Sequence, residues 1–202
     1  MKKIILTGLI LLFAIATFDF FHKSASASLI VGTEEIKWCT LEEAQKLSDA
    51  APRKIFIDFT TSWCGWCKVM DANTFQNPTI AKYMNEKYYC VKFNAETQDS
   101  VIFNGQKFGN RGAANARSAN DFTLTVLQGK ASYPSFAFIS KDRMSFTIMQ
   151  GYMPPEQFEP YIHYYGEDME KTTEYAEFIK TFKTELPSST DKQTPPAATD
   201  KH

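Results

Sequence analysis

The chain has 202 residues, of which 44% are hydrophobic and 14% aromatic, so it can form a folded core and is not a wholly disordered protein. Its 22 basic and 23 acidic side chains give a formal net charge of -1, which excludes the basic surface typical of nucleic-acid-binding proteins. The three histidines are scattered, which argues against a histidine-rich metal site, and four cysteines are too few to staple a miniprotein.

The first 27 residues have the pattern of a signal peptide. Two lysines precede an apolar run from Ile4 to Phe18, and Ala25-Ser26-Ala27 offers a small-residue cleavage site. The apolar run is short for a membrane span, which needs roughly 20 residues, although an uncleaved anchor is the alternative. We therefore expect a periplasmic or secreted protein, in a compartment where disulfides persist.

The opposite end, residues 186–202, is predicted to be a disordered tail. After Leu186 it contains no large apolar side chain, so it cannot bury enough surface to offset the entropy of ordering. Residues 28–185 remain, which is close to the usual size of one domain.

Between these ends the pattern alternates strands and helices. The first predicted elements are a strand at 36–38, a helix capped by Thr40 and ended by Pro52, with Leu41, Ala44 and Leu47 on one face, and a strand at 55–59. They are followed by a helix from Cys64 to about Thr74, a helix after Asn77-Pro78, a strand at 88–94, a hairpin at 101–108 and a helix at 120–128 closed by Gly129. The last are strands at 135–140 and 145–151 and two C-terminal helices, with apolar faces at 158, 161, 162, 165 and at 175, 178, 179, 182.

Several of these elements are predicted from short local patterns. Thr40 and Glu43 form a capping box, and the almost wholly apolar run at 55–59 is typical of a central strand covered on both faces. Asn104-Gly105 supplies the positive φ angles of a type I′ hairpin turn. Strands that alternate with helices indicate an α/β domain.

Cys64 and Cys67 lie where the predicted central strand is followed by a helix, in Trp63-Cys64-Gly65-Trp66-Cys67-Lys68. Two cysteines at this spacing are within reach of a disulfide and near the positive end of the helix dipole. That setting lowers a cysteine pKa from about 8.5 to roughly 3.5–7.5, so Cys64 is predicted to attack a disulfide and Cys67 to resolve the mixed disulfide. The alternatives are half of a zinc site, which lacks a second close pair of ligands, and an inert structural disulfide.

The run Phe56-Ile57-Asp58-Phe59, followed by this cysteine motif, resembles the core of the thioredoxin superfamily over about residues 30–182. With Trp38, the turn at 103–105 and the stretch 127–134, it also resembles exported thioredoxin-like (thiol–disulfide interchange) proteins of Bacteroidetes. The resemblance implies an α/β thioredoxin fold, a central mixed five-stranded sheet flanked by helices. A hairpin and loop insertion at 97–120 would precede the family's cis-proline, and an extra helix would end the domain.

The resemblance also implies roles for three further residues. Asp58 stands where the family has a buried carboxylate, which would have a raised pKa and accept the proton of Cys67. Lys92 matches a lysine on the neighbouring strand that would modulate Asp58. Pro134 matches the proline whose preceding peptide bond is cis, which would leave the backbone of Tyr133 free to pair with substrate. The alternatives are a solvated aspartate, a surface lysine and an ordinary trans proline.

Trp63 and Trp66 are candidates for an exposed apolar rim that binds substrate beside Cys64. Simple packing over the helix is the alternative, and it is favoured for Trp63. Trp66 also stands where typical thioredoxins have proline, so the redox potential is open within roughly -120 to -270 mV.

The sequence therefore predicts an exported thiol–disulfide oxidoreductase that acts on protein or peptide thiols and disulfides and serves cell redox homeostasis. We expect a monomer with no cofactor and no metal, which binds no nucleic acid and works with a membrane or periplasmic redox partner. The alternatives are a peptide-binding or chaperone-like module that uses the Trp66 rim and the insertion, and a reductase for cytochrome maturation, which differs only in its partner.

Cys39 and Cys90 lie on strands that the resemblance makes neighbours. Adjacent strands are about 4.8 Å apart, so a structural disulfide between these residues is one hypothesis. Two packed thiols are slightly favoured, because adjacent parallel strands offer poor geometry for a bridge.

Overall fold

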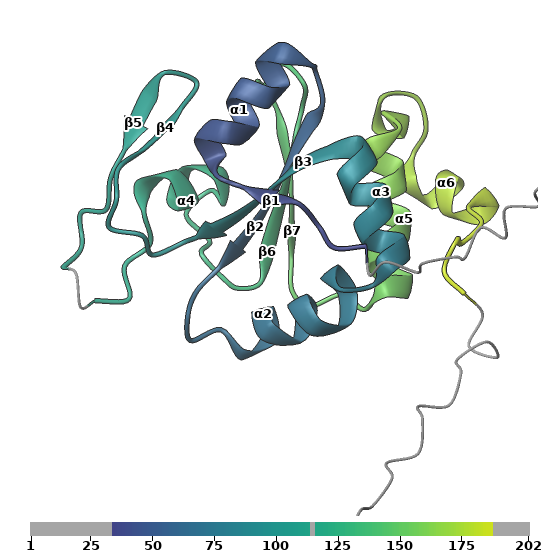
Figure 1. Ribbon diagram of the computed structural model, residues 1–202, viewed down its shortest axis with the longest axis horizontal. Helices are drawn as coiled ribbons and strands as arrows, with labels where there is room; N and C mark the ends of the chain where they lie inside the picture. The colour runs from purple at the N-terminus through teal and green to yellow at the C-terminus, as the bar shows by residue number, and fades with distance from the viewer. Residues whose placement is uncertain (1–33, 114–115, 188–202) are drawn as a thin grey trace, which may run out of the picture. The chain divides into compact units, whose positions relative to one another are not determined.

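The computed structural model describes residues 34–113 and 116–187, so the signal-peptide pattern and residues 188–202 lie outside the described part. Five strands form one sheet in the order β1-β3-β2-β6-β7 (Figure 1). They are β1 (Trp38–Cys39), β2 (Lys54–Thr60), β3 (Tyr88–Asn94), β6 (Ser135–Ile139) and β7 (Phe146–Gln150). β3 runs parallel to β1 and β2, whereas β6 is antiparallel to both β2 and β7. This mixed five-stranded sheet, flanked by helices, confirms the predicted thioredoxin fold.

β2 is the central strand, as its apolar sequence predicts. It pairs with β3 on one side and β6 on the other, and six of its seven residues are buried. A strand covered on both faces needs apolar side chains at successive positions instead of alternating ones. Asp58 and Lys54 are the buried charged exceptions.

One face of the sheet is covered by α1 (Leu41–Ala50) and α4 (Asp121–Val126), and the hairpin of β4 (Val101–Phe103) and β5 (Gln106–Phe108) packs against these two helices. The other is covered by α2 (Gly65–Met70), α3 (Pro78–Lys87) and α5 (Pro155–Gly166). Because successive strand residues point to opposite faces, Ile57 packs in the first cluster and Phe56 in the second. Asp58 alternates with Ile57, so its side chain points to the same face as α2.

The predicted capping box is confirmed, but the predicted apolar face of α1 is partly wrong. Glu43 N–H donates to Thr40 Oγ1 and Thr40 N–H donates to Glu43 Oε2. Leu41, Ala44 and Ser48 are the buried residues of α1, whereas Leu47 is 44% exposed. Position 47 lies about 100° around the helix from the row formed by the three buried positions.

The helix predicted from Cys64 to about Thr74 is divided into two parts. α2 ends at Met70 and the chain continues as a π-helical turn over Asp71–Phe75, closed by a bond from Gln76 N–H to Asp71 O. π-Helical turns are rare and occur frequently at functional sites. This one carries Asp71 toward β3 and buries Phe75 in the second cluster.

The hairpin in the insertion has the predicted turn. Asn104 and Gly105 have φ angles of 49° and 76°, the left-handed conformation that a type I′ turn requires at both positions. Asn120, which is fully buried, fixes the end of the insertion to the rest of the domain. Its Oδ1 caps α4 by accepting from Phe122 N–H, and its Nδ2 donates to the carbonyls of Thr97 and Asp99.

We expect Asn120→Ala to lower the free energy of unfolding by about 2 kcal/mol, because it removes a helix cap and leaves two part-buried carbonyls without their donor. Urea unfolding of both proteins measures the difference. Asn73→Ala is the matched control, since its exposed amide makes only one long bond, to Tyr152 Oη, and the change should stay within about 0.5 kcal/mol. Equal losses in the two variants would contradict this role for Asn120.

The predicted C-terminal helices are α5 and α6 (Tyr175–Thr181), joined through a 3₁₀ turn at Met169–Lys171. Phe158 and Ile162 of α5 are fully buried, as predicted. In α6 only Phe178 is buried; Ile179 is 41% exposed and Phe182 lies beyond the helix. The predicted apolar face is confirmed for Tyr175, Phe178 and Phe182, whose rings contact Tyr161, Tyr164 and His163 of α5 respectively. It is wrong for Ile179.

Beyond α6 the chain still contacts the domain. Thr184 Oγ1 and Glu185 N–H both donate to the buried carboxylate of Glu159, and Leu186 packs partly buried against the second cluster.

Cys39 and Cys90 are both free thiols. In the β1–β3 register Cys39 lies opposite Val91 and Cys90 opposite Trp38, so the two side chains point to opposite faces of the sheet. Cys39 accordingly contacts the first core cluster, whereas Cys90 belongs to the second. The hypothesis of a bridge is wrong, and the favoured prediction of two packed thiols is confirmed.

Candidate active site

The two cysteines of the motif are joined by a disulfide at the start of α2. Their Cα atoms are 5.3 Å apart, and both residues are buried, at 4% and 3% exposed. Cys64 is the N-cap residue, and its Sγ accepts a hydrogen bond from Cys67 N–H at 3.1 Å. After reduction the same N–H group faces the Cys64 sulfur, where it can stabilise a thiolate.

Asp58 lies in the centre of β2 with only 1% of its surface exposed. Burial raises the pKa of its carboxyl from 3.8 to about 7, and the nearby positive charge of Lys92 opposes that rise. Lys92 Nζ is 3.7 Å from Asp58 Oδ2, while Oδ1 has no hydrogen-bond partner among the described residues. The alternative of a solvated aspartate is therefore wrong, and this carboxyl can exchange a proton near neutral pH.

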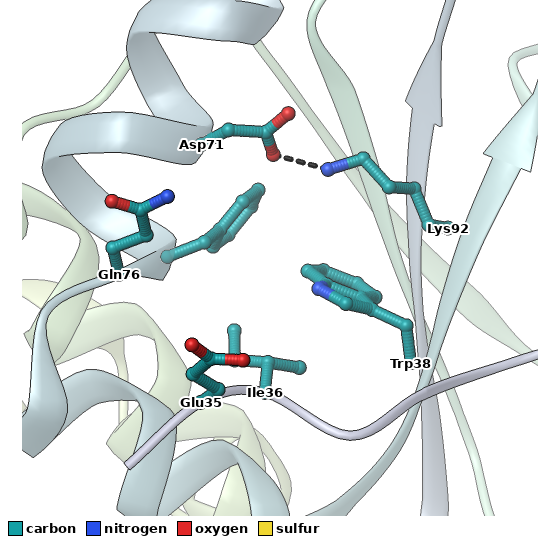
Figure 2. Close-up of a pocket in the computed structure, with 7 residues that line it drawn as sticks. Glu35, Ile36, Trp38, Asp71, Gln76 and Lys92 are labelled. Atoms are coloured by element: carbon teal, nitrogen blue, oxygen red, sulfur yellow. Dashed lines mark hydrogen bonds and ion pairs between the residues drawn. The ribbon is translucent and has the colours of Figure 1, made fainter. Parts of the chain in front are cut away.

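Lys92 is directly opposite Asp58 in the β2–β3 register, yet its ammonium group bonds to Asp71. Figure 2 shows the two groups facing each other, with the indole of Trp38 beside the lysine. Lys92 Nζ lies 5.0 Å from the centroid of that ring. Because Lys92 is shared between two carboxylates, it offsets only part of the cost of burying the charge of Asp58.

A cavity of about 270 Å³ opens beside this ion pair (Figure 2). Its lining residues come from the segment before β1, from β1, from the π-helical turn and from β3: Glu35, Ile36, Trp38, Asp71, Phe75, Gln76 and Lys92. Lys92 thus lines a solvent-accessible space on one side and contacts the buried carboxyl of Asp58 on the other.

Both tryptophans of the motif are exposed, Trp63 at 45% and Trp66 at 61%. Trp63 Nε1 donates to Glu96 Oε2 at 2.9 Å, and its ring meets Tyr133 edge-to-face with centroids 5.9 Å apart. Trp66 contacts Tyr152, with ring centroids 5.4 Å apart. Trp63 is therefore both packed and accessible, and each indole next to the cysteines is supported by a tyrosine.

The peptide bond between Tyr133 and Pro134 is cis, so the alternative of a trans proline is wrong. Pro134 directly precedes β6, and its carbonyl accepts from Gly151 N–H at 2.9 Å. Through the contact between Tyr133 and Trp63, the turn before β6 meets the residue that precedes Cys64.

Sequence reasoning missed three residues of this region: Asp71, Glu96 and Arg117. Asp71 follows Cys67 by four positions, about one helical turn, so its place on the same face of the helix was a detectable pattern. Glu96 and Arg117 carry no comparable local pattern, because their contacts with Trp63 join segments far apart in the chain.

Among residues 34–113 and 116–187, no three or more His, Cys, Asp or Glu side chains are grouped so that they could hold a metal ion. Within the same residues no helix is long and apolar enough to cross a membrane.

Comparisons with known proteins give a family match and a curated relative, each over part of the chain. Residues 21–106 match the family model described as "Thioredox_DsbH: Protein of unknown function, DUF255". A segment of 60 residues is 32% identical to mouse spermatogenesis-associated protein 20. The matched segment is 30% of this chain but only 8% of that protein.

Several solved structures are similar to the chain at less than 25% identity and with TM-scores below 0.5. A DsbH oxidoreductase is 18% identical, with a TM-score of 0.46, over 66% of this chain and 85% of its own. A thioredoxin from Thermus thermophilus is 14% identical, with a TM-score of 0.47, over 64% and 85%. The oxidised C-terminal domain of DsbD from Neisseria meningitidis is 17% identical, with a TM-score of 0.39, over 62% and 90%.

The strand order, the cis peptide before β6 and the buried cysteine pair at the start of α2 define a thioredoxin-fold protein with the site of a thiol–disulfide oxidoreductase. The match to the Thioredox_DsbH model covers residues 21–106, which is less than half of the chain.

Proposed function

We propose that this protein is an exported thiol–disulfide oxidoreductase that exchanges disulfides with protein or peptide substrates through Cys64 and Cys67. The observation that carries the proposal is the disulfide at the first turn of α2, with Cys67 N–H directed at Cys64 Sγ. Exposed aromatic side chains on both sides of Cys64 offer contact surface for a polypeptide. The signal-peptide pattern of residues 1–27 supports export.

The reaction has two steps. In the reduced protein the Cys64 thiolate attacks one sulfur of a substrate disulfide; a bond forms between Cys64 and that sulfur, and the other substrate sulfur leaves as a thiolate. Cys67 then loses its proton to the Asp58 carboxylate, directly or through a water, and attacks Cys64 Sγ. The second substrate sulfur leaves, so the substrate has gained two electrons and the cysteine pair has lost two.

The same steps in reverse oxidise a substrate dithiol. Repeated turnover in either direction requires a redox partner that resets the cysteine pair, and a membrane or periplasmic thiol–disulfide protein is of the right class. The direction is set by the potential of the pair relative to that partner.

A Cys67→Ser variant is expected to accumulate mixed disulfides with its substrates, because the step that releases them is lost. Cells that express the full chain would be treated with acid to quench exchange, fractionated, and the periplasmic and secreted proteins separated without reducing agent. Adducts that disappear on reduction are the expected result.

The double variant Cys64→Ser, Cys67→Ser is the control and should form no adduct. Equal adducts in both variants would contradict attack by Cys64. A complete absence of adducts, with non-covalent capture of the same partners by both variants, would instead favour the peptide-binding module.

A further inference from the structure

Asn110 and Ser118 are fixed to each other and to the segment after β3. Asn110 Oδ1 accepts from Gly112 N–H and Ser118 Oγ, and Asn110 Nδ2 donates to Ser118 O at 2.8 Å. The same amide donates to Thr97 O at 3.2 Å. Both ends of the loop at 109–118 are therefore held beside the segment that carries Glu96, whose carboxylate binds Trp63.

This anchoring places Arg117 over the residue that precedes the attacking cysteine. The guanidinium carbon of Arg117 lies 4.7 Å from the centroid of the Trp63 ring. Trp63 is itself fixed by a hydrogen bond from its N–H to Glu96 and by an edge-to-face contact with Tyr133. A guanidinium stacked on an indole is oriented by the ring, while the N–H donors at its edges stay free.

The charges nearby leave Arg117 available for a ligand. Across the described residues no carboxylate lies within 4.0 Å of its guanidinium, and the carboxylate of Glu96 already accepts from Trp63. Arg111, the other arginine of the loop, differs: it donates to Asp121 through Nε and Nη2, at 3.0 and 2.8 Å.

We propose that Arg117 determines specificity by binding a carboxylate side chain of the substrate close to the disulfide that Cys64 attacks. The proposal rests on the proposed function of the site and adds the substrate class: polypeptides with Asp or Glu near the reacting cysteine. Arginine binds a carboxylate through two parallel hydrogen bonds, and its place beside Trp63 sets where that carboxylate must lie.

Three disulfide-bonded peptides would test it, identical except for Glu, Ser or Lys two positions from one cysteine. The reduced wild-type protein is expected to have a kcat/KM about fivefold higher for the Glu peptide than for the Lys peptide, which is the size expected of an exposed ion pair. Arg117→Glu should reverse the order, and 0.5 M salt should weaken both preferences.

Arg111→Glu is the matched control, since it makes the same charge change in the same loop away from Trp63. It should keep the wild-type order. Equal ratios in wild type and Arg117→Glu, or an equal shift in Arg111→Glu, would overturn the assignment to Arg117. Wild type and Arg111→Glu should turn over the Ser peptide equally, and the far-UV circular dichroism spectra of all three proteins should coincide, which shows that each is folded.

Turnover of the Ser peptide by wild type also distinguishes failure of the proposed function from failure of the Arg117 assignment. If wild type does not turn it over, the proposed function fails and the peptides are compared by equilibrium binding instead. A preference for the Glu peptide that Arg117→Glu removes would then still support the carboxylate site, and equal binding of all three peptides would overturn it.

Discussion

Replacement of Cys64 by serine is expected to reduce insulin reduction, assayed with dithiothreitol, to the rate of dithiothreitol alone. Cys64 caps α2, where Cys67 N–H stabilises its thiolate; a serine hydroxyl there can accept the same hydrogen bond but cannot form a mixed disulfide. Insulin precipitation, followed by turbidity, measures the rate. Turnover by Cys64→Ser equal to that of wild type would refute the catalytic role.

Cys39→Ser is the matched control, because Cys39 is a half-buried free thiol outside the motif. Burial raises the pKa of Cys39, and the negative charge of Glu43 adds to the rise, so the residue stays a thiol at neutral pH. Its Sγ contacts the carbonyl of Cys90, a bond that a hydroxyl can replace. Turnover should therefore match wild type, and a large loss would show that a second thiol takes part.

The sequence predicted those parts of the fold that depend on neighbouring residues. The capping box at Thr40, the Asn77-Pro78 helix start and the Asn104-Gly105 turn are each decided within a few positions, and each is present. The run at 55–59 predicted a central strand because burial on both faces leaves a continuous apolar sequence.

The predictions that were wrong, and the contacts that were not predicted, depend on packing between segments that are distant in the chain. Leu47 is apolar but lies outside the buried row of α1, and Ile179 is exposed because little of the domain covers α6. The one-residue offset between Cys39 and Cys90 is a matter of strand register, which local sequence does not specify.

In the candidate site, the cysteine pair and Asp58 were predictable from spacing and resemblance, but the partners of their neighbours were not. Glu96 lies 33 positions after Trp63 and reaches it because the parallel strands β2 and β3 end side by side, with Thr60 opposite Asn94. The sequence indicated that Lys92 would act on Asp58, whereas its shorter contact is with Asp71. The extra carboxylate helps to keep the pKa of Asp58 high, near 7.

Asp58→Asn is expected to slow the step in which Cys67 resolves the mixed disulfide by about 10²-fold at pH 7 to 8, because a general base is lost. A chromogenic aromatic disulfide releases its two thiols in successive phases, and the second phase reports this step. In wild type its rate should rise with pH to a shoulder near 7, the pKa to which burial raises Asp58. In the variant it should rise only with the ionisation of the Cys67 thiol, ordinarily near 8.5.

Asp71→Asn is the control for the pH profile. It removes a negative charge that raises the pKa of Asp58 and frees Lys92 to approach that carboxyl. The shoulder should therefore remain and move to lower pH. A shoulder unchanged in Asp58→Asn would show that another group is the base.

Asp58→Asn is also expected to stabilise the fold, with a pH dependence that follows from the raised pKa of Asp58. The Asp58 pKa is raised from 3.8 in the unfolded chain to about 7 in the folded protein, where burial disfavours the charge. Between these values the folded state holds the extra proton, so wild-type stability falls as pH rises from about 4 to about 7 and is then level. The difference between the two pKa values corresponds to about 4 kcal/mol of stability at most.

Urea unfolding should find Asp58→Asn more stable than wild type at pH 8, and the gain in stability should be much smaller at pH 4. A variant that is slower but no more stable at pH 8 would contradict a charged, buried Asp58. Loss of rate together with gain of stability is expected if this carboxyl is retained for proton transfer at the expense of the fold.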